Sequence, residues 1–173
     1  RRHAMQSDSV ISKLYGITIT YKPAVIVGMA NNFDQSPTNS CIAINAAAKI
    51  PGKYDKTHLF GDVDCQLFIA GTQLSKVVTL NGWRIGLAIC YDVEFPEVVR
   101  ALALNGTDLV VIPTANMTPF DSVATRLVPA RAEENAVYMA YCNYVGREGE
   151  FSYNGLSCIC GPDGNDITRG DAQ

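Results

Sequence analysis

The sequence predicts an α/β fold in which buried strands form a sheet and helices pack against it. Short, continuously apolar runs such as residues 24–30 are typical of strands that are buried on both faces. Elsewhere Val98, Val99 and Leu102 recur at helical spacing. With 173 residues, 47% hydrophobic and 18% charged, the chain is long enough for one core and too short for two ordinary domains. We therefore expect a single domain over residues 1–173.

The first part of the chain alternates apolar runs with polar breaks. Residues 8–15 have the pattern of the end of a helix, and residues 24–30 that of a buried strand. We expect a polar loop at residues 31–39 and a second strand at residues 41–46. A turn is expected at residues 49–53, where a Pro-Gly pair breaks the pattern.

A hairpin is expected in the middle of the chain. Two strand-like segments, residues 77–80 and 84–89, flank Asn81 and Gly82. Asn-Gly between apolar strands is the strongest short hairpin signal in this sequence, because both residues accept the positive φ of the tight turn.

A helix is expected directly after this hairpin, from Pro96 to Asn105. Proline suits the first helical position, Glu97 faces the positive end of the helix dipole, and Gly106 ends the helix. The next buried strand is expected at residues 108–112. The unit is therefore a strand, a turn, a helix and a second strand.

The last third of the chain predicts one more helix and several strands. Asp121 is expected to cap a helix that reaches about Asn135 and bends at Pro129. Residues 137–144 have the pattern of a strand, and a turn at residues 161–164 separates two further strand-like segments.

Cys90 stands where the nucleophile of an open α/β sheet would stand. It ends an apolar strand at the strand-to-helix turn, outside the carboxyl ends of the strands, where such folds place their chemistry. A cysteine is more often just a small buried hydrophobic residue. The position immediately before a helix start sets Cys90 apart from that default.

The remaining cysteines favour neither a disulfide framework nor a metal site. The chain has six cysteines at irregular spacing, too few for a disulfide scaffold at this length. Cys158 and Cys160 have no second pair, and the histidines are His3 and His58, so we expect no zinc site and no cofactor. Four cysteines lie in apolar, strand-like stretches and are expected to be reduced and packed: Cys41, Cys142, Cys158 and Cys160.

Charge and hydropathy exclude two further classes. The net charge is −3 and the basic residues are scattered, so we expect no nucleic-acid partner. No apolar run approaches the roughly 20 residues that cross a bilayer. The N-terminus shows no apolar signal core. We expect a cytoplasmic protein without membrane contact.

A cysteine needs a nearby cation, a helix N-terminus or a base to react as the thiolate. Lys56 lies 34 residues before Cys90 (90 − 56), between a turn and an apolar pair, and is the preferred partner. The ordinary role of a lysine is a solvated surface charge. His58 is the alternative base, although no protease cysteine signature surrounds Cys90.

Four segments together resemble one enzyme family. They are residues 56–61 (KTHLFG), 90–97 (CYDVEFPE), 113–119 (PTANMTP) and 130–135 (ARAEEN). Over essentially its whole length the chain is similar to the nitrilase superfamily of carbon-nitrogen hydrolases, and within it to the aliphatic amidases. The resemblance implies an α-β-β-α sandwich, present here in incomplete form.

The resemblance also implies a catalytic set of glutamate, lysine and cysteine. Cys90 matches the nucleophile, which forms a thioester with the acyl group. Lys56 matches the lysine that stabilises the oxyanion together with a backbone N–H, here expected from Tyr91. Many members carry a second glutamate between the lysine and the cysteine. Counting back from Gly71, its place falls on Asp64, which is one methylene shorter.

The family's general base has no counterpart in this sequence. It is a glutamate after a strand and a proline, whereas the carboxylates before Lys56 are Asp8, Asp34 and Asp55, none in that setting. Loss of such a proton carrier would cost about 10²- to 10⁴-fold in rate. We therefore expect the chain to lack an N-terminal segment with this glutamate, and a C-terminal segment that in the family helps to form the dimer.

The expected substrate pocket draws on the first three of these segments. Glu94 has a second interpretation, as a structural ion-pair partner beside the turn together with Glu97 and Arg100. The residues expected to line the pocket are Phe60, Glu94, Asn116 and Met117.

The function favoured by the resemblance is hydrolysis of a linear carboxamide to a carboxylate and ammonia, through a thioester on Cys90. The expected partners are a small-molecule amide and further copies of the chain, in a homodimer or larger homo-oligomer. Two alternatives stay open. One is a noncatalytic member that serves assembly or ligand binding. The other is a thiol enzyme in which replacing His58, and not Lys56, abolishes activity.

Overall fold

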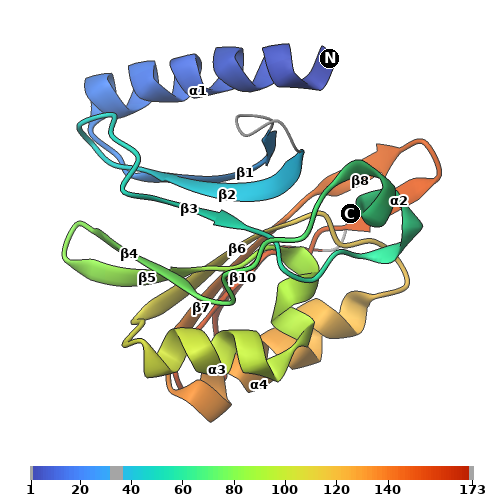
Figure 1. Cartoon of the computed structure of the whole chain (residues 1–173). Helices are drawn as coiled ribbons and strands as arrows, with labels where there is room; N and C mark the ends of the chain where they lie inside the picture. Colours follow the sequence, from blue (N-terminus) through green and yellow to red (C-terminus); the bar gives the residue numbers. More distant parts are fainter. Residues whose placement is uncertain (1, 32–36, 172–173) are drawn as a thin grey trace.

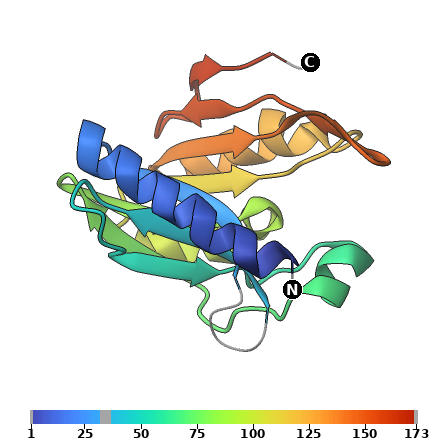
Figure 2. The same ribbon diagram turned by 90° about the horizontal axis from the view of Figure 1, so that it is seen from above.

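Four layers stack in the computed structural model, which describes the backbone of residues 2–31 and 37–171 and the side chains from Ser9 onward. Helix α1 (Arg2–Tyr21) covers a three-stranded sheet, a six-stranded sheet lies beneath, and α3 (Pro96–Leu104) and α4 (Val128–Asn135) cover the outer face (Figures 1 and 2). The predicted α-β-β-α sandwich is confirmed.

The first sheet is antiparallel, with the order β1 (Val25–Asn31), β2 (Thr38–Ile44), β3 (Gly52–Asp55). Ile11 of α1 packs on its outer face, against Ile42 and Ile44. The expected end of a helix at residues 8–15 lies within α1, which continues to Tyr21 although its many β-branched residues are weak helix formers.

Two expectations for this region were wrong. The strands extend into the expected polar loop, where Asn31 pairs with Thr38; residues 32–36 lie outside the described part of the chain. The expected turn at residues 49–53 contains the start of β3, because Gly52 and Lys53 pair with β2. In both cases backbone pairing with a neighbouring strand overrides the local polar sequence.

The second sheet is mixed, with six strands. Its central strands β5, β6 and β7 are parallel, and the outer strands pair antiparallel. The predicted hairpin is confirmed: Asn81 and Gly82 have φ values of +50° and +84° between β4 and β5. The order is β11 (Asp166–Arg169), β10 (Cys158–Cys160), β7 (Tyr138–Asn143), β6 (Leu109–Thr114), β5 (Trp83–Leu87), β4 (Lys76–Leu80).

Helix α3 is confirmed in place and extent. Pro96 is its first residue, and Val98, Val99 and Leu102 are fully buried on its inner face. Gly106 follows the helix with a φ of +75°, as a helix-ending glycine requires.

The second expected helix differs in detail. Asp121 does not cap it; its carboxylate instead accepts a hydrogen bond of 2.7 Å from Asn154 Nδ2. The departure from α-helical geometry is a π-helical turn, η2 (Val123–Leu127), which ends two residues before Pro129. Such π turns are an established cause of helix bending.

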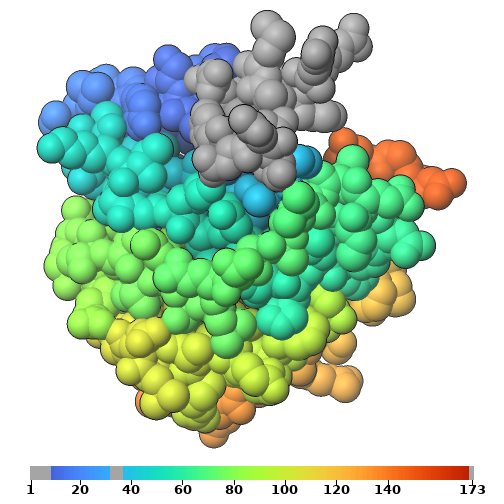
Figure 3. Space-filling view, viewed as in Figure 1, coloured from blue at the N-terminus to red at the C-terminus, as the bar shows by residue number. Residues whose placement is uncertain are grey.

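Two small elements lie at the same end of the molecule. One is the short helix α2 (Gly61–Leu67), and the other is the hairpin of β8 (Val145–Glu148) and β9 (Phe151–Asn154). The space-filling view shows residues around α2 in green and the hairpin in orange on that side (Figure 3). In the described part of the chain, no helix combines the length and the apolar character needed to span a membrane.

Candidate active site

The site begins with an unusual backbone conformation at Cys90. β5 ends at Leu87, and Cys90 opens the 3₁₀ turn η1 (Cys90–Glu94), which leads directly into α3. The φ of Cys90 is +45°, a left-handed value that residues other than glycine rarely adopt. Such strain gathers at functional sites, where the surroundings hold it in place. The half-buried thiol thus lies on a sharp strand-to-helix turn.

Lys56 follows β3 on a closely held segment of backbone. Its N–H donates to the carbonyl of Asn39 and its own carbonyl accepts from the N–H of Gly71, each at 2.8 Å. Gly71 has no substitute here, because a Cβ atom would stand 2.2 Å from the carbonyl oxygen of Asp55. The Lys56 side chain is only 3% exposed. The position of Lys56 is therefore fixed by its backbone hydrogen bonds and by the burial of its side chain.

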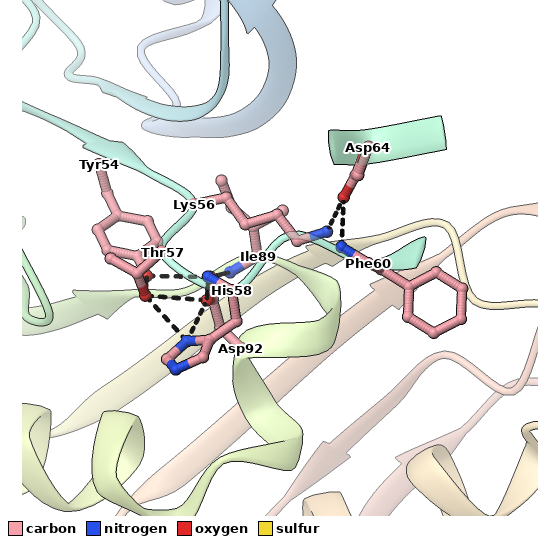
Figure 4. A network of polar contacts seen from close by, with 8 residues as sticks. All are labelled: Tyr54, Lys56, Thr57, His58, Phe60, Asp64, Ile89 and Asp92. Carbon is pink, nitrogen blue, oxygen red and sulfur yellow. Dashed lines mark hydrogen bonds and ion pairs between the residues drawn. The ribbon is translucent and has the colours of Figure 1, made fainter. Parts of the chain in front are cut away.

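The Lys56 ammonium forms an ion pair with the carboxylate of Asp64 from α2. The same Asp64 oxygen accepts the backbone N–H of Phe60 at 3.1 Å. Asp64 is 17% exposed at its side chain. The structure thus brings together the lysine and the shorter carboxylate that the sequence singled out (Figure 4).

Opposing effects act on the Cys90 thiol. Burial raises its pKa, and the charge of Asp64 raises it further. The charge of Lys56 and the backbone N–H groups of Ala115 and Tyr91 lower it. The net shift of the pKa is upward. The thiolate therefore needs a proton acceptor when substrate arrives, but the donors that would stabilise negative charge are already in place.

Cys90, Lys56 and Asp64 line one cavity of about 690 Å³. Phe60 and Met117, two of the four expected pocket residues, also line it. Most of its surface is apolar, with contributions from both sheets and the β8–β9 hairpin. Other lining residues include Ile26, Met29, Asp62, Ala115, Cys142, Asn143, Phe151 and Tyr153.

The other two expected pocket residues are not among those that line the cavity. Asn116 is buried, and its side chain donates to the carbonyl of Phe120 at 2.9 Å. Glu94 is half-buried, burial raises its pKa, and its carbonyl accepts from Arg131 Nη2 at 3.0 Å.

The expected ion pairs beside the turn do not form. Among the ion pairs between described residues, none includes Glu94, Glu97 or Arg100. Arg100 Nη2 instead donates to the backbone carbonyl of Glu134 at 3.0 Å. The η1 turn after Cys90 is held instead by Arg131, whose Nε donates to the backbone carbonyl of Val93 at 3.1 Å.

Of the carboxylates before Lys56, Asp55 is the one whose side chain the structure describes, and it is not among the residues that line the cavity. Asp55 is engaged within the first sheet, where it accepts from Thr38 Oγ1 at 3.0 Å and Ser40 Oγ at 2.5 Å. Asp34 and the side chain of Asp8 lie outside the described residues. Among the described residues that line the cavity, the carboxylates are Asp62 and Asp64.

His58 is engaged by Asp92 and Phe95. Its Nδ1 lies 3.1 Å from Asp92 Oδ1, and its ring stacks on Phe95 with centroids 3.8 Å apart. It is not among the residues that line the cavity. This placement disfavours His58 as a base for Cys90.

Sequence reasoning missed the part played by Asp92. Its side chain is fully buried between the lysine and cysteine segments and accepts hydrogen bonds from both (Figure 4). The available signal was an acidic residue between two apolar ones, Tyr91 and Val93, directly after the expected nucleophile. A buried carboxylate is rare unless it is fully paired.

The cysteines outside the site depart from expectation at two points. Cys142, expected to be packed, is exposed and lines the cavity. Cys158 and Cys160 are buried as expected, but Asp166 joins them to form a three-residue cluster. Both oxygens of Asp166 already accept from the Arg169 guanidinium, at 2.6 and 2.7 Å, so this carboxylate is not a free metal ligand.

Comparison with known proteins finds similar hydrolases and amidases. A family model described as carbon-nitrogen hydrolase matches residues 2–173. A Pseudomonas protegens protein named hydrolase in pqqF 5'region is 49% identical over 129 residues, 75% of this chain and 45% of that protein. An (R)-stereoselective amidase of a Pseudomonas species is 36% identical over 71% of this chain and 44% of that enzyme. The chain thus spans about half the length of these curated relatives.

The similar solved structures include an amidase from Nesterenkonia sp.. It matches with a TM-score of 0.93 at 32% identity, over 99% of this chain and 65% of that chain. One mutant of that amidase is described in complex with butyramide. Another is described as showing covalent addition of the acetamide moiety of fluoroacetamide at the active site cysteine.

Proposed function

The chain belongs to the carbon-nitrogen hydrolase family, and from that premise we propose that it contributes the nucleophile for hydrolysis of a linear carboxamide. The products would be a carboxylate and ammonia, and the intermediate a thioester on Cys90. One observation carries the proposal: Cys90, on its strained turn, opens into the same cavity as the buried, ion-paired Lys56.

The acylation step assigns a role to each group around the thiol. Cys90 Sγ attacks the amide carbon and forms a C–S bond, while the carbonyl electrons move onto oxygen. The Lys56 ammonium and the N–H of Tyr91 are the donors available for that oxyanion. The C–N bond then breaks, and the nitrogen leaves as ammonia with the proton that the thiol has given up.

Deacylation returns the free thiol. Water adds to the thioester, the C–S bond breaks, and the acyl group leaves as a carboxylate. Both steps need a group that carries protons between sulfur, nitrogen and water. We assign Asp64 to holding the Lys56 ammonium. The proton carrier would be the glutamate that the family resemblance implies, which is not among the described residues that line the cavity.

The cavity favours a small, uncharged acyl group. Its walls are mainly apolar, and Lys56 is already paired with Asp64. Butyramide, bound by the Nesterenkonia amidase mutant, is a substrate of this kind to test first. We also propose that the protein acts as a homodimer or larger homo-oligomer in the cytoplasm.

The deciding experiment measures ammonia release from a panel of short aliphatic amides. The chain of 173 residues is compared with a form extended upstream by a segment that carries the glutamate implied by the family resemblance. Activity that needs Cys90 and appears in the extended form supports the proposal. Activity in neither form favours a noncatalytic role, and activity in both forms shows that no upstream glutamate is needed.

A further inference from the structure

Two segments that are distant in sequence meet at the carboxylate of Asp92. On the basis of the proposed function, we propose that Asp92 is a positioning residue, which fixes the segment carrying Lys56 against the turn carrying Cys90. Asp92 is fully buried and is not among the residues that line the cavity. Any effect on the reaction must therefore pass through Lys56 and Cys90.

One carboxylate oxygen holds the lysine segment. Asp92 Oδ1 accepts the backbone N–H of His58 at 3.0 Å and the hydroxyl of Thr57 at 3.2 Å, and lies 3.1 Å from Nδ1 of His58. Thr57 and His58 are the two residues that directly follow Lys56. The segment that carries the ammonium is thus tied to Oδ1 by a side chain one residue beyond the lysine and by a backbone N–H two residues beyond it.

The other oxygen holds the cysteine turn. Asp92 Oδ2 accepts the backbone N–H of Ile89, the residue before Cys90, at 3.0 Å, and the hydroxyl of Tyr54 at 3.0 Å. The N–H of Asp92 in turn donates to the carbonyl of Ile89 at 3.0 Å. These reciprocal bonds close the turn around Cys90 and hold its positive φ.

A carboxylate is required because each oxygen faces a backbone N–H. Those donors, His58 N–H on Oδ1 and Ile89 N–H on Oδ2, cannot turn into acceptors. An asparagine amide would set its own NH₂ against one of them in either orientation. Asp92→Asn therefore breaks one of the two links whichever way the amide turns.

The test reads the position of Lys56 through the reactivity of Cys90. Lys56 lowers the pKa of the thiol, so releasing the lysine segment raises the pH midpoint of Cys90 alkylation. Asp64, Tyr141 and Tyr153 are the other titratable groups that interact with this thiol. Alkylation by iodoacetamide is followed from pH 6 to about 11, a range that spans the ordinary thiol pKa, by mass spectrometry of the Cys90 peptide.

We expect Asp92→Asn to raise the midpoint by about one pH unit, which is about tenfold slower alkylation below the midpoint. In a Lys56→Gln background the same change should produce no further shift. The matched control is Asp108→Asn, an aspartate that accepts the backbone N–H of Arg84 at 2.9 Å beside the start of β5 and should leave the midpoint unchanged.

A thermal melt of each variant checks that the fold persists. If Asp92→Asn does not fold, Thr57→Val removes one donor to Oδ1 and should give a smaller upward shift, also absent with Lys56→Gln. A lowered melting temperature with an unchanged midpoint overturns the inference, as does an equal shift in both backgrounds. Alkylation needs no amide turnover, so a shift with no ammonia release from either the 173-residue or the extended form would refute the proposed function and leave the role of Asp92 standing.

Discussion

Replacing Lys56 by methionine separates its proposed catalytic role from its structural one. Methionine keeps most of the apolar stem and removes the ammonium, which is 3% exposed, paired with Asp64, and open to the same cavity as Cys90. Removal of one preorganised oxyanion donor costs about 10²- to 10³-fold in kcat. That loss corresponds to about 2.7–4.1 kcal/mol of transition-state stabilisation.

The stability cost of the same change should be smaller than for a deeply buried pair. Breaking a fully buried ion pair costs about 3–5 kcal/mol, because a charge is left without compensation. Asp64 is 17% exposed and keeps the N–H of Phe60 at 3.1 Å, so it is partly solvated after the substitution. We therefore expect a loss of about 1–3 kcal/mol in the free energy of unfolding for Lys56→Met.

Four proteins test both the oxyanion-donor role of Lys56 and the stability cost of breaking its ion pair: the native form, Lys56→Met, Asp64→Asn and the double variant. Urea unfolding should show the double variant less destabilised than the sum of the single variants, because no unpaired charge remains. Ammonia release in the extended form should stay as low in the double variant as in Lys56→Met. Recovery of activity in the double variant, or a kcat for Lys56→Met within about tenfold of native, would refute the assignment of Lys56 as the oxyanion donor.

Two further predictions concern the fold. Leu102→Ala, on the fully buried face of α3, should lower the free energy of unfolding in urea by about 2–5 kcal/mol. Leu104→Ala in the same helix, 79% exposed, should stay within about 0.5 kcal/mol of native. Burial raises the pKa of Cys41 from 9.0 to about 12, so its contribution to stability is full below pH 9 and is lost towards pH 12. Cys41→Ala should flatten that decline, and the exposed Cys65→Ala should not.

The large elements of the fold were predictable because their signals are local. The Asn81-Gly82 pair specifies its turn because both residues accept a positive φ. The apolar residues at helical spacing in α3 predict its buried face. The start of β3 at Gly52 was not predictable in this way. Its strand character arises from pairing with Ala43 across the sheet, which the local Pro-Gly sequence contradicts.

The candidate site could be predicted where a single residue stands in a recognisable sequence segment. Cys90 and Lys56 stand in recognisable segments, and Asp64 could be placed by counting from Gly71. Asn116 could be placed after a strand end, but the direction of its side chain depends on the carbonyl of Phe120, which no sequence pattern reports. Residues that act through hydrogen bonds to partners distant in sequence cannot be identified from a sequence motif.

The strain at Cys90 explains why the turn after it is so heavily bonded. A left-handed φ in a residue with a Cβ costs about 1–2 kcal/mol, and a net intramolecular hydrogen bond returns about 0.5–1.5 kcal/mol. Two bonds between Ile89 and Asp92, with those from Arg131 to the carbonyls of Val93 and Glu94, are enough to offset it. None of residues 91–95 is among those that line the cavity. These residues hold the backbone shape that presents the thiol and the Tyr91 N–H, the proposed oxyanion donor. Side-chain changes there should therefore act through the position of Cys90 and of that N–H.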